Sequence, residues 1–428
     1  MKKTTILPIL ALLAFTQCEQ TNSQIPPKTK TMKNEIETKT GTINNGKAFT
    51  DDKAVVAGNN QFANDLFENY CLSEQHKNKN IFFSPFSIYS AIAMTGEGAK
   101  DKTALEIQQV LHLPENKSLR LSGFENLMSV LNPGSTMYKL TTANALWVQK
   151  EYAFLPEFLA ITKERYKANA ENVDFVNQPE AAKNKINTWV EDNTNNKIKD
   201  LISKNDITKY TRLILTNTIY FKGEWARQFE KELTKEENFK SANGDELKTQ
   251  MMHIQRSFPY TETEEAQVLE MPYKNNELSM IVILPKNGYT IKSISSTKNL
   301  KTFLTSNIKY ELLQISFPKF KIEAKYLMKE DLTKMGMSLP FTDNADFSGM
   351  TGKKELQISQ VIHQTFVEVD EAGTEATAAT AVAMEAGGMP KREEPKQFNA
   401  NHPFIFAIRQ NTTGAILFMG VLNNPGEK

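Results

Sequence analysis

The side chains that could perform catalysis do not form a recognisable catalytic motif in this sequence. There is no zinc-binding H-E-x-x-H pattern, no C-x-x-C pair, no G-x-S-x-G elbow and no glycine-rich phosphate loop. A Ser–His–Asp triad could be assembled from distant positions in any chain of this size, and nothing in the spacing favours one. The sequence therefore predicts a protein that is not an enzyme and that carries no metal and no other cofactor. Its five histidines are His76, His112, His253, His363 and His402.

Two polar side chains lie inside segments that otherwise read as apolar strands. His363 lies in "SQVIHQTFVEV" and Asn217 lies in "LILTNTIYF". A lone histidine in such a strand is more often a hydrogen-bonded core residue than a catalyst, and buried polar groups need partners. We expect these two side chains to form one buried network with Ser84 and Ser87 of "FFSPFSIYS". The alternative is that each of the four is satisfied separately.

A long stretch of small residues separates two strand patterns near the C-terminus. It is the segment 369–398, "VDEAGTEATAATAVAMEAGGMPKREEPKQF". Connections of this length are uncommon in compact domains and are usually functional or disordered. From Thr374 to Met384 one set of alternate residues carries no charge, whereas the other set carries Glu375 and Glu385. This alternation is typical of a strand buried on one side, although alanine also favours a helix.

Helix and strand patterns follow one another irregularly in the rest of the chain. Apolar residues at three- and four-residue spacing predict helices in the first half, starting with the one that contains Phe62, Leu66 and Tyr70. After Leu356 almost the whole chain reads as strand. Mixed helices and mostly antiparallel strands, without a regular strand–helix alternation, indicate an α+β fold.

The overall composition is that of an ordinary soluble globular protein. Hydrophobic residues make up 40% and charged residues 24% of the chain. The 51 basic and 50 acidic side chains balance, which argues against nucleic acid as a partner. Outside the N-terminus, no segment approaches the roughly 20 apolar residues that a membrane-spanning helix needs.

The N-terminus has the pattern of an export signal. Lys2 and Lys3 precede the apolar run "ILPILALLAF", and Cys18 follows it where a bacterial lipoprotein carries its lipidated cysteine. We therefore expect residues 1–18 to be a signal peptide, of lipoprotein type or, alternatively, of ordinary secretory type. Either form makes the protein extracellular, periplasmic or attached to the cell surface, and it would contact a membrane only through the lipid.

The remainder divides into a tether and one domain. Residues 19–57 are rich in Thr, Lys, Asn and Gln and are expected to form a flexible polar tether, and residues 58–428 to form a single domain. Cys71 lies in a helical pattern and is expected to be a small buried hydrophobic residue. With Cys18 lipidated or removed, no disulfide can form within the chain.

Five segments of the chain, in order, match the pattern of one known family. They are "NIFFSPFSIYSAIAMTGEGAKDKT", "TNTIYFKGEW", "FPKFKIEAKYLMKEDLTKMGM", "VEVDEAGTEATAATAV" and "FNANHPFIFAI". From about Asn59 to Pro425 the chain resembles the serpins, serine protease inhibitors whose hinge and C-terminal signature the last two segments match. Asn401 departs mildly from the pattern, because Asp is more usual there.

The resemblance implies the fold and the roles of particular residues. It implies a serpin fold with a large central mixed sheet, two smaller sheets, about eight or nine helices and an exposed reactive-centre loop at about residues 371–397. Ser84, Ser87, Asn217 and His363 correspond to the polar cluster beneath the point where the central sheet opens, and Trp225 to the place where insertion begins. The hinge residues are Glu371, Gly373, Thr374, Ala376, Ala378 and Ala379.

The resemblance also implies protease inhibition by a monomer. The loop acts as a suicide substrate: a target protease of serine or cysteine type cuts it, the hinge side inserts into the central sheet, and the protease stays bound as an acyl-enzyme. Between Thr374 and Ala383 the hinge has no proline and only one charge, Glu375, which favours insertion. The alternative is a non-inhibitory serpin that acts as a binding or carrier protein.

The resemblance defines the position of the cleaved bond less well than it defines the hinge. Family spacing from Thr374 places it near Gly387–Gly388, whereas counting back from Phe398 places it nearer Met389. Met384 is a further alternative. Each of these residues before the cut would suit elastase-like or chymotrypsin-like enzymes.

Overall fold

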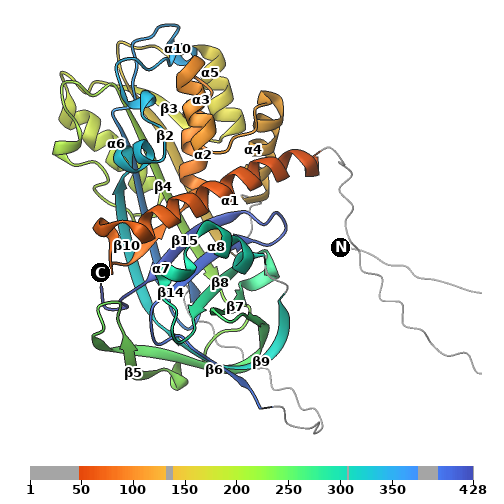
Figure 1. Cartoon of the computed structure of the whole chain (residues 1–428). Coiled ribbons are helices and arrows are strands. Elements are labelled where there is room, and N and C mark those ends of the chain that lie inside the picture. Colours follow the sequence, from red (N-terminus) through yellow and green to blue (C-terminus); the bar gives the residue numbers. More distant parts are fainter. Residues whose placement is uncertain (1–47, 132–137, 306–307, 375–393, 428) are drawn as a thin grey trace, which may run out of the picture. The chain divides into compact units, whose positions relative to one another are not determined.

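The structure, a computed structural model of the chain, describes residues 48–131, 138–305, 308–374 and 394–427. Within these residues it has ten α-helices and two β-sheets (Figure 1), which confirms the α+β class and gives one or two helices more than expected. The helices are α1 (Ala48–Leu72), α2 (Pro85–Gly96), α3 (Asp101–Val110), α4 (Lys117–Leu131), α5 (Pro156–Arg165), α6 (Pro179–Asn193), α7 (Ile291–Ile294), α8 (Thr297–Leu304), α9 (Lys329–Lys334) and α10 (Ser348–Thr351).

The strands fall into a six-stranded and a nine-stranded sheet. The six-stranded sheet has the order β10-β11-β12-β4-β2-β3, and the other has the order β1-β15-β14-β8-β7-β6-β9-β13, with β5 added on β6. The strands are β1 (Ile81–Phe83), β2 (Tyr138–Gln149), β3 (Asn169–Val173), β4 (Leu213–Glu224), β5 (Lys235–Lys240), β6 (Glu246–Glu262), β7 (Ala266–Pro272), β8 (Leu278–Pro285), β9 (Lys309–Pro318), β10 (Phe320–Leu327), β11 (Gln360–Val369), β12 (Gly373–Thr374), β13 (Lys396–Asn399), β14 (Phe404–Gln410) and β15 (Ile416–Leu422).

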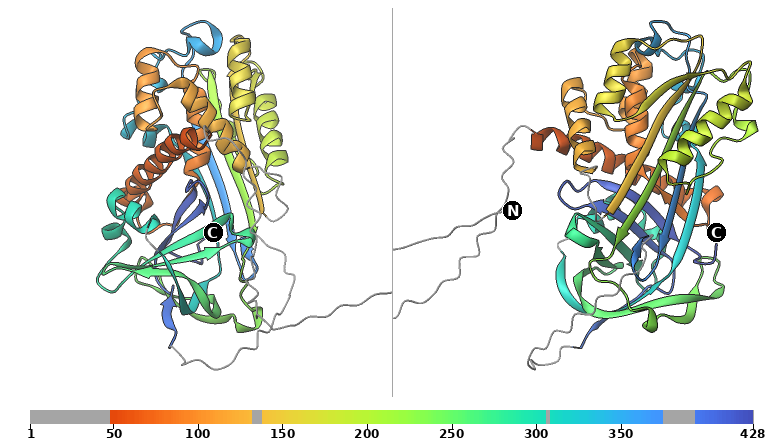
Figure 2. Two further views of the ribbon diagram at one scale, coloured as in Figure 1. Left: turned by 90° about the vertical axis from the view of Figure 1, so that its right-hand side faces the viewer. Right: turned by 180° about the vertical axis from the view of Figure 1, so that it is seen from behind.

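The six-stranded sheet is mixed and is covered on both faces. Figure 2 shows α2 and α6 on opposite faces of it. Side chains alternate between the two faces, so that in β2 Trp147 packs in the cluster that includes α6, whereas Leu146 belongs to the main core on the other side. Because both faces are buried, its long strands read as nearly continuous apolar runs, as in "LILTNTIYF".

The two smaller sheets expected from the sequence are joined into one. Strand β6 is long enough to belong to both parts, because its residues Met251–Tyr260 pair with β9 while Tyr260–Glu262 pair with β7. The sequence of β6 includes Pro259 and several charged residues, and for that reason it was not predicted as a strand.

Helix α1 begins inside the segment that was expected to be a tether. The predicted tether covered residues 19–57, but the helix starts at Ala48. Val55 and Val56 are buried in the main core, and the Asn59 amide donates to the Ile416 carbonyl at 3.0 Å. Two valines in a polar stretch gave too short an apolar pattern to predict this first part of the helix.

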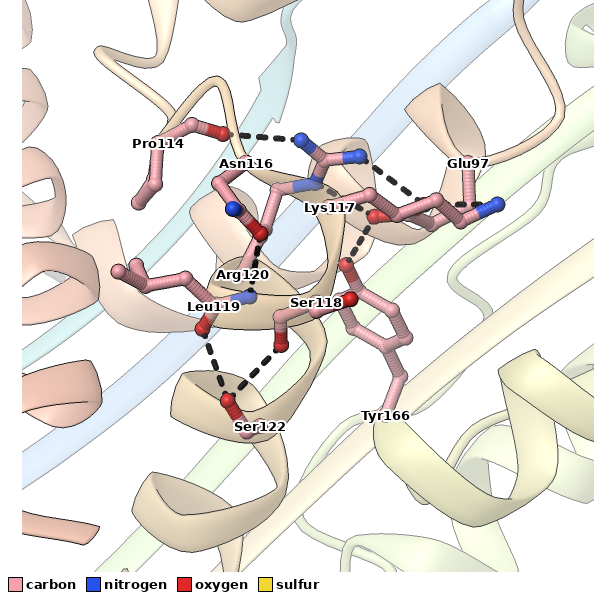
Figure 3. A network of polar contacts seen from close by, with 9 residues as sticks. All are labelled: Glu97, Pro114, Asn116, Lys117, Ser118, Leu119, Arg120, Ser122 and Tyr166. Carbon is pink, nitrogen blue, oxygen red and sulfur yellow. Dashed lines mark hydrogen bonds and ion pairs between the residues drawn. The ribbon is translucent and has the colours of Figure 1, made fainter. Parts of the chain in front are cut away.

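A buried ion pair joins α2, α4 and the end of α5 (Figure 3). The Arg120 side chain donates to both Glu97 oxygens, at 2.6 and 3.1 Å, and the Tyr166 hydroxyl donates to Glu97 at 3.0 Å. Burial by itself lowers the pKa of Arg120, but the hydrogen bonds and charge of Glu97 raise it overall. Lys117 also lies 3.8 Å from Glu97, so the buried carboxylate joins residues from all three helices and helps to hold them together.

Cys71 was expected to be a small buried residue. It packs against the core but is only half-buried, and burial raises the pKa of its thiol to about 12. Within the ranges given above, no helix has the length and hydropathy required to cross a bilayer.

Candidate functional site

The four polar residues singled out in the sequence lie in one hydrogen-bonded network. His363 in β11 and Asn217 in β4 are directly opposite in the parallel pairing of these strands, and His363 Nδ1 lies 2.5 Å from Asn217 Oδ1. Asn217 donates to Ser87 Oγ at 2.5 Å, and the Ser84 amide donates to His363 Nε2 at 3.0 Å. The side chains are therefore connected rather than satisfied separately.

The hydrogen bonds define the protonation of His363. Because Nε2 accepts from the Ser84 amide, the ring proton is on Nδ1 and is donated to Asn217. Burial lowers the pKa of His363 to about 3, and the bond to Asn217 offsets only part of this effect. The ring is neutral, and both of its nitrogens are used in hydrogen bonds. This arrangement links strands to a helix and leaves no ring nitrogen for proton transfer to a substrate.

The network includes two residues that the sequence analysis missed. Asn144 in β2 lies directly opposite Asn217 and accepts a hydrogen bond from its amide, and the Asn144 amide in turn donates to Ser90 Oγ at 2.9 Å. Ser90 donates to the Ser87 carbonyl. Asn144 shows the same signal as Asn217, an amide in a strand of small and apolar residues ("TTANALWVQ"), and could have been found by it.

Gly373 and Thr374, which the resemblance predicts to be hinge residues, form the short strand β12 between β11 and β4. Thr374 is opposite Val369 on one side and opposite Gly223 on the other. Its side chain is fully buried, and its hydroxyl lies 2.7 Å from the Tyr273 hydroxyl. At Gly373 a Cβ atom would lie 2.1 Å from the Gly223 carbonyl oxygen, so only glycine fits.

Below β12, strands β11 and β4 pair with each other directly. The direct parallel pairing joins Gln360–Phe366 to Ile214–Tyr220. Strand β12 is antiparallel to both neighbours. The six-stranded sheet is therefore open to a third strand at the level of Thr374 and closed beneath it.

Glu371 and Trp225 anchor the chain just before β12. The Glu371 carboxylate accepts from Lys319 at 2.9 Å and from Thr234 at 2.7 Å. Burial raises the pKa of Glu371, but these hydrogen bonds outweigh it and hold the pKa below its usual range. The Trp225 indole donates to the Asp370 carbonyl and stacks on Tyr273 at 4.5 Å.

The remaining predicted site residues lie outside the residues that the structure describes. These are Cys18, Ala376, Ala378, Ala379, Met384, Gly387, Gly388 and Met389. Across the described ranges there is no group of three or more His, Cys, Asp or Glu side chains placed to hold a metal ion.

Comparison with known proteins gives one consistent result. The family model described as Serpin (serine protease inhibitor) matches residues 57–425. An uncharacterized serpin-like protein of Thermococcus kodakarensis is 42% identical over 87% of this chain and 86% of its own length, and the leukocyte elastase inhibitor of Bos taurus is 40% identical over 86% and 99%. The crystal structure of Serpin48 from the insect Tenebrio molitor has a TM-score of 0.79 and 32% identity, covering 87% of this chain and 98% of that one.

These matches agree with the family resemblance found in the sequence. The family model covers most of the chain, and each relative is matched over nearly its whole length. The chain belongs to the serpin family.

Proposed function

We propose that this protein inhibits a protease by acting as its suicide substrate. The observation that carries the proposal is the position of β12. Thr374 already pairs with β11 and β4, and the chain that follows it would continue as a strand between them once β11 and β4 separate. A sheet that holds the first residue of such a strand is suited to accept the rest.

The uncut loop is held at both ends. Thr374 belongs to the six-stranded sheet, whereas β13 pairs with β9 at the edge of the nine-stranded sheet. Full insertion would require the loop to be released at one end. Cleavage of the loop provides this release, since it separates the hinge side from β13.

The chemistry of trapping follows from this release. The serine or cysteine nucleophile of the protease attacks a carbonyl carbon in the loop, the peptide bond breaks, and the hinge-side fragment becomes an ester or thioester of the protease. The leaving amine becomes the new N-terminus of the C-terminal fragment, which stays in the nine-stranded sheet through β13, β14 and β15. Hydrolysis of the ester would free the protease, so inhibition requires insertion of the hinge side to be faster than this hydrolysis.

Insertion gains more strand pairing than it loses. It breaks the direct parallel ladder between Gln360–Phe366 and Ile214–Tyr220 and forms two antiparallel ladders in its place. The net gain is about one ladder of seven residue pairs. At roughly 0.5–1.5 kcal/mol for each hydrogen bond, this gain is about 4–10 kcal/mol.

The proposed cut lies at Gly387–Gly388, with Met384 and Met389 as alternatives. A small residue or a methionine before the cut suits an elastase-like or chymotrypsin-like serine protease, and a cysteine protease is the other class to test. We further propose that the protein acts outside the cytoplasm as a monomer and is exported through residues 1–18, with a lipid on Cys18.

The test is to mix the protein with pancreatic elastase, chymotrypsin, trypsin and papain and to look for a complex that survives SDS. We expect such a complex with elastase or chymotrypsin, and mass spectrometry of the released C-terminal fragment gives the cleaved bond. Complete cleavage of the loop by each of the four enzymes with no stable complex would contradict inhibition. That result would favour the binding or carrier protein instead.

A further inference from the structure

A cavity of about 490 Å³ lies away from the strand opening and the hinge. It is formed by the end of α1 with the turn that follows it, the start of β1, the turn after β5, the segment between β8 and α7, and the connection between β13 and β14. Figure 1 shows the C-terminal end of α1 and α7 on the same side of the domain as β5. The volume falls within the range of small-molecule sites, about 300–1,000 Å³.

We propose that this cavity binds a small amphiphilic carboxylate, with its apolar part against the wall and its carboxylate at Lys240 and Lys292. The inference does not depend on protease inhibition, because it concerns the uncleaved protein and different residues.

The wall of the cavity offers an apolar surface from several elements. Leu72 at the end of α1 is 52% exposed, although the neighbouring apolar residues of this helix are in the core. Ile81 is almost fully buried, and Tyr289, Ile291 and Pro403 are half-buried. A ligand with an alkyl or ring system would cover Leu72 and remove this surface from water.

The charged groups around the cavity are mostly positive. Lys77, Lys240 and Lys292 line the cavity together with a single acidic residue, Glu74. Lys77 pairs with Glu74 at 3.1 Å, and Lys240 and Lys292 are exposed and have no acidic partner within 4.0 Å among the residues described. A ligand that carries one negative charge would offset part of this positive charge.

The surroundings favour a carboxylate over a phosphate. A phosphate site is usually built from several backbone N–H donors, often at a helix N-terminus. Helix α7 has only four residues, and the Thr290 and Ser293 side chains already bond each other's backbone amides in a capping box. Lysine ammonium groups beside an apolar wall instead suit a ligand with one acidic head and an apolar body.

His402 also lines the cavity and is held in place from both sides. One of its ring nitrogens lies 2.9 Å from the Pro285 carbonyl oxygen and the other 3.1 Å from Asn401 Oδ1. Both ring nitrogens are therefore used within the protein, and the two lysines remain the cationic groups for a ligand.

The probe is dodecanoate, added to the uncleaved full-length protein and followed by calorimetry. We expect one site with a dissociation constant in the micromolar range. Dodecyltrimethylammonium, which has the same tail and the opposite charge, should bind at least about tenfold more weakly. The double variant Lys240→Gln/Lys292→Gln should lose about tenfold in affinity. The matched control Lys298→Gln/Lys301→Gln removes two exposed lysines of α8 and should bind normally.

The location of binding is read from Leu72, which lines the cavity. Leu72→Gln, at an exposed position, should weaken binding with little risk to folding. Absence of binding, equal affinity of the lysine double variant and wild type, or equal affinity of Leu72→Gln and wild type would each overturn the proposal.

Discussion

Replacing Thr374 with arginine should convert the protein from an inhibitor into a substrate. The Thr374 side chain is fully buried between β11 and β4, and among the described residues its hydroxyl contacts only the Tyr273 hydroxyl, at 2.7 Å. Tyr273 is itself buried, which raises its pKa far above the usual range and keeps it neutral. Because this position is already buried in the uncut protein, we expect arginine to expel β12 from between β11 and β4. Insertion would then have to bury the cation beside a neutral hydroxyl.

The size of the effect can be estimated from the energy of insertion. An unpaired buried charge costs about 3–5 kcal/mol. Insertion gains about 4–10 kcal/mol from the net ladder between β11 and β4, so the arginine offsets much of this gain. If about 3 kcal/mol of the cost is felt in the transition state, insertion slows by about two orders of magnitude. Hydrolysis of the acyl-enzyme is unaffected and would then free the protease.

The assay measures the number of inhibitor molecules consumed for each protease molecule inactivated. We expect a value near one for the wild type and above about ten for Thr374→Arg, with equal rates of loop cleavage. Thr374→Ser keeps the hydroxyl and should trap normally, whereas Thr374→Val leaves the Tyr273 hydroxyl unpaired and should be intermediate. By the strand alternation predicted from the sequence, Glu375→Arg should still trap. Normal trapping by Thr374→Arg, or equal failure of Thr374→Arg and Glu375→Arg, would refute the reasoning.

Three other predictions concern stability and export. Cleavage of the loop by a protease that is not trapped should raise the melting temperature by roughly 5–12 °C, because insertion adds a ladder; equal melting temperatures of cut and uncut protein would argue against insertion. His363 has a pKa of about 3 when folded and about 6.5 when unfolded, so its contribution to stability is complete above pH 6.5 and falls by up to about 1.4 kcal/mol per pH unit below it. Urea unfolding at pH 7.5 and 4.5 should therefore show a smaller loss of stability for His363→Gln than for the wild type, and an identical loss would contradict this assignment. Cys18→Ser should release the protein from membranes, and the lipid assignment fails if palmitate is never incorporated into the wild type.

The polar network was predictable in part from the sequence. An amide and an imidazole in two apolar strands needed partners, and this requirement was enough to group Asn217 and His363 with Ser84 and Ser87. That Asn144 lies opposite Asn217 depends on the register of β2 against β4. The segment "TTANALWVQ" has no turn or charge that would fix this register, so the contact could not be derived from local sequence.

For the predicted hinge, too, the local sequence pattern was informative, whereas the tertiary contact could not be predicted. The alternation of small and charged residues indicated which side of the segment from Thr374 could be buried. The partner of the Thr374 hydroxyl, Tyr273, follows the end of β7 and is distant in sequence. Its position depends on how the nine-stranded sheet packs against the six-stranded one, and no spacing in the sequence reports that packing.

In the proposed mechanism, the network at His363 would be a local barrier to sheet opening rather than its main thermodynamic restraint. When β11 separates from β4, the bond from His363 Nδ1 to Asn217 Oδ1 must break, but the other partners need not be lost. Asn217 can keep Ser87, and His363 can keep the Ser84 amide. Opening would therefore leave one buried donor and one acceptor unpaired, at a cost of about 1–3 kcal/mol each. The direct ladder between Gln360–Phe366 and Ile214–Tyr220 is the larger restraint on opening. An inserted strand would replace it by pairing with β11 on one side and with β4 on the other.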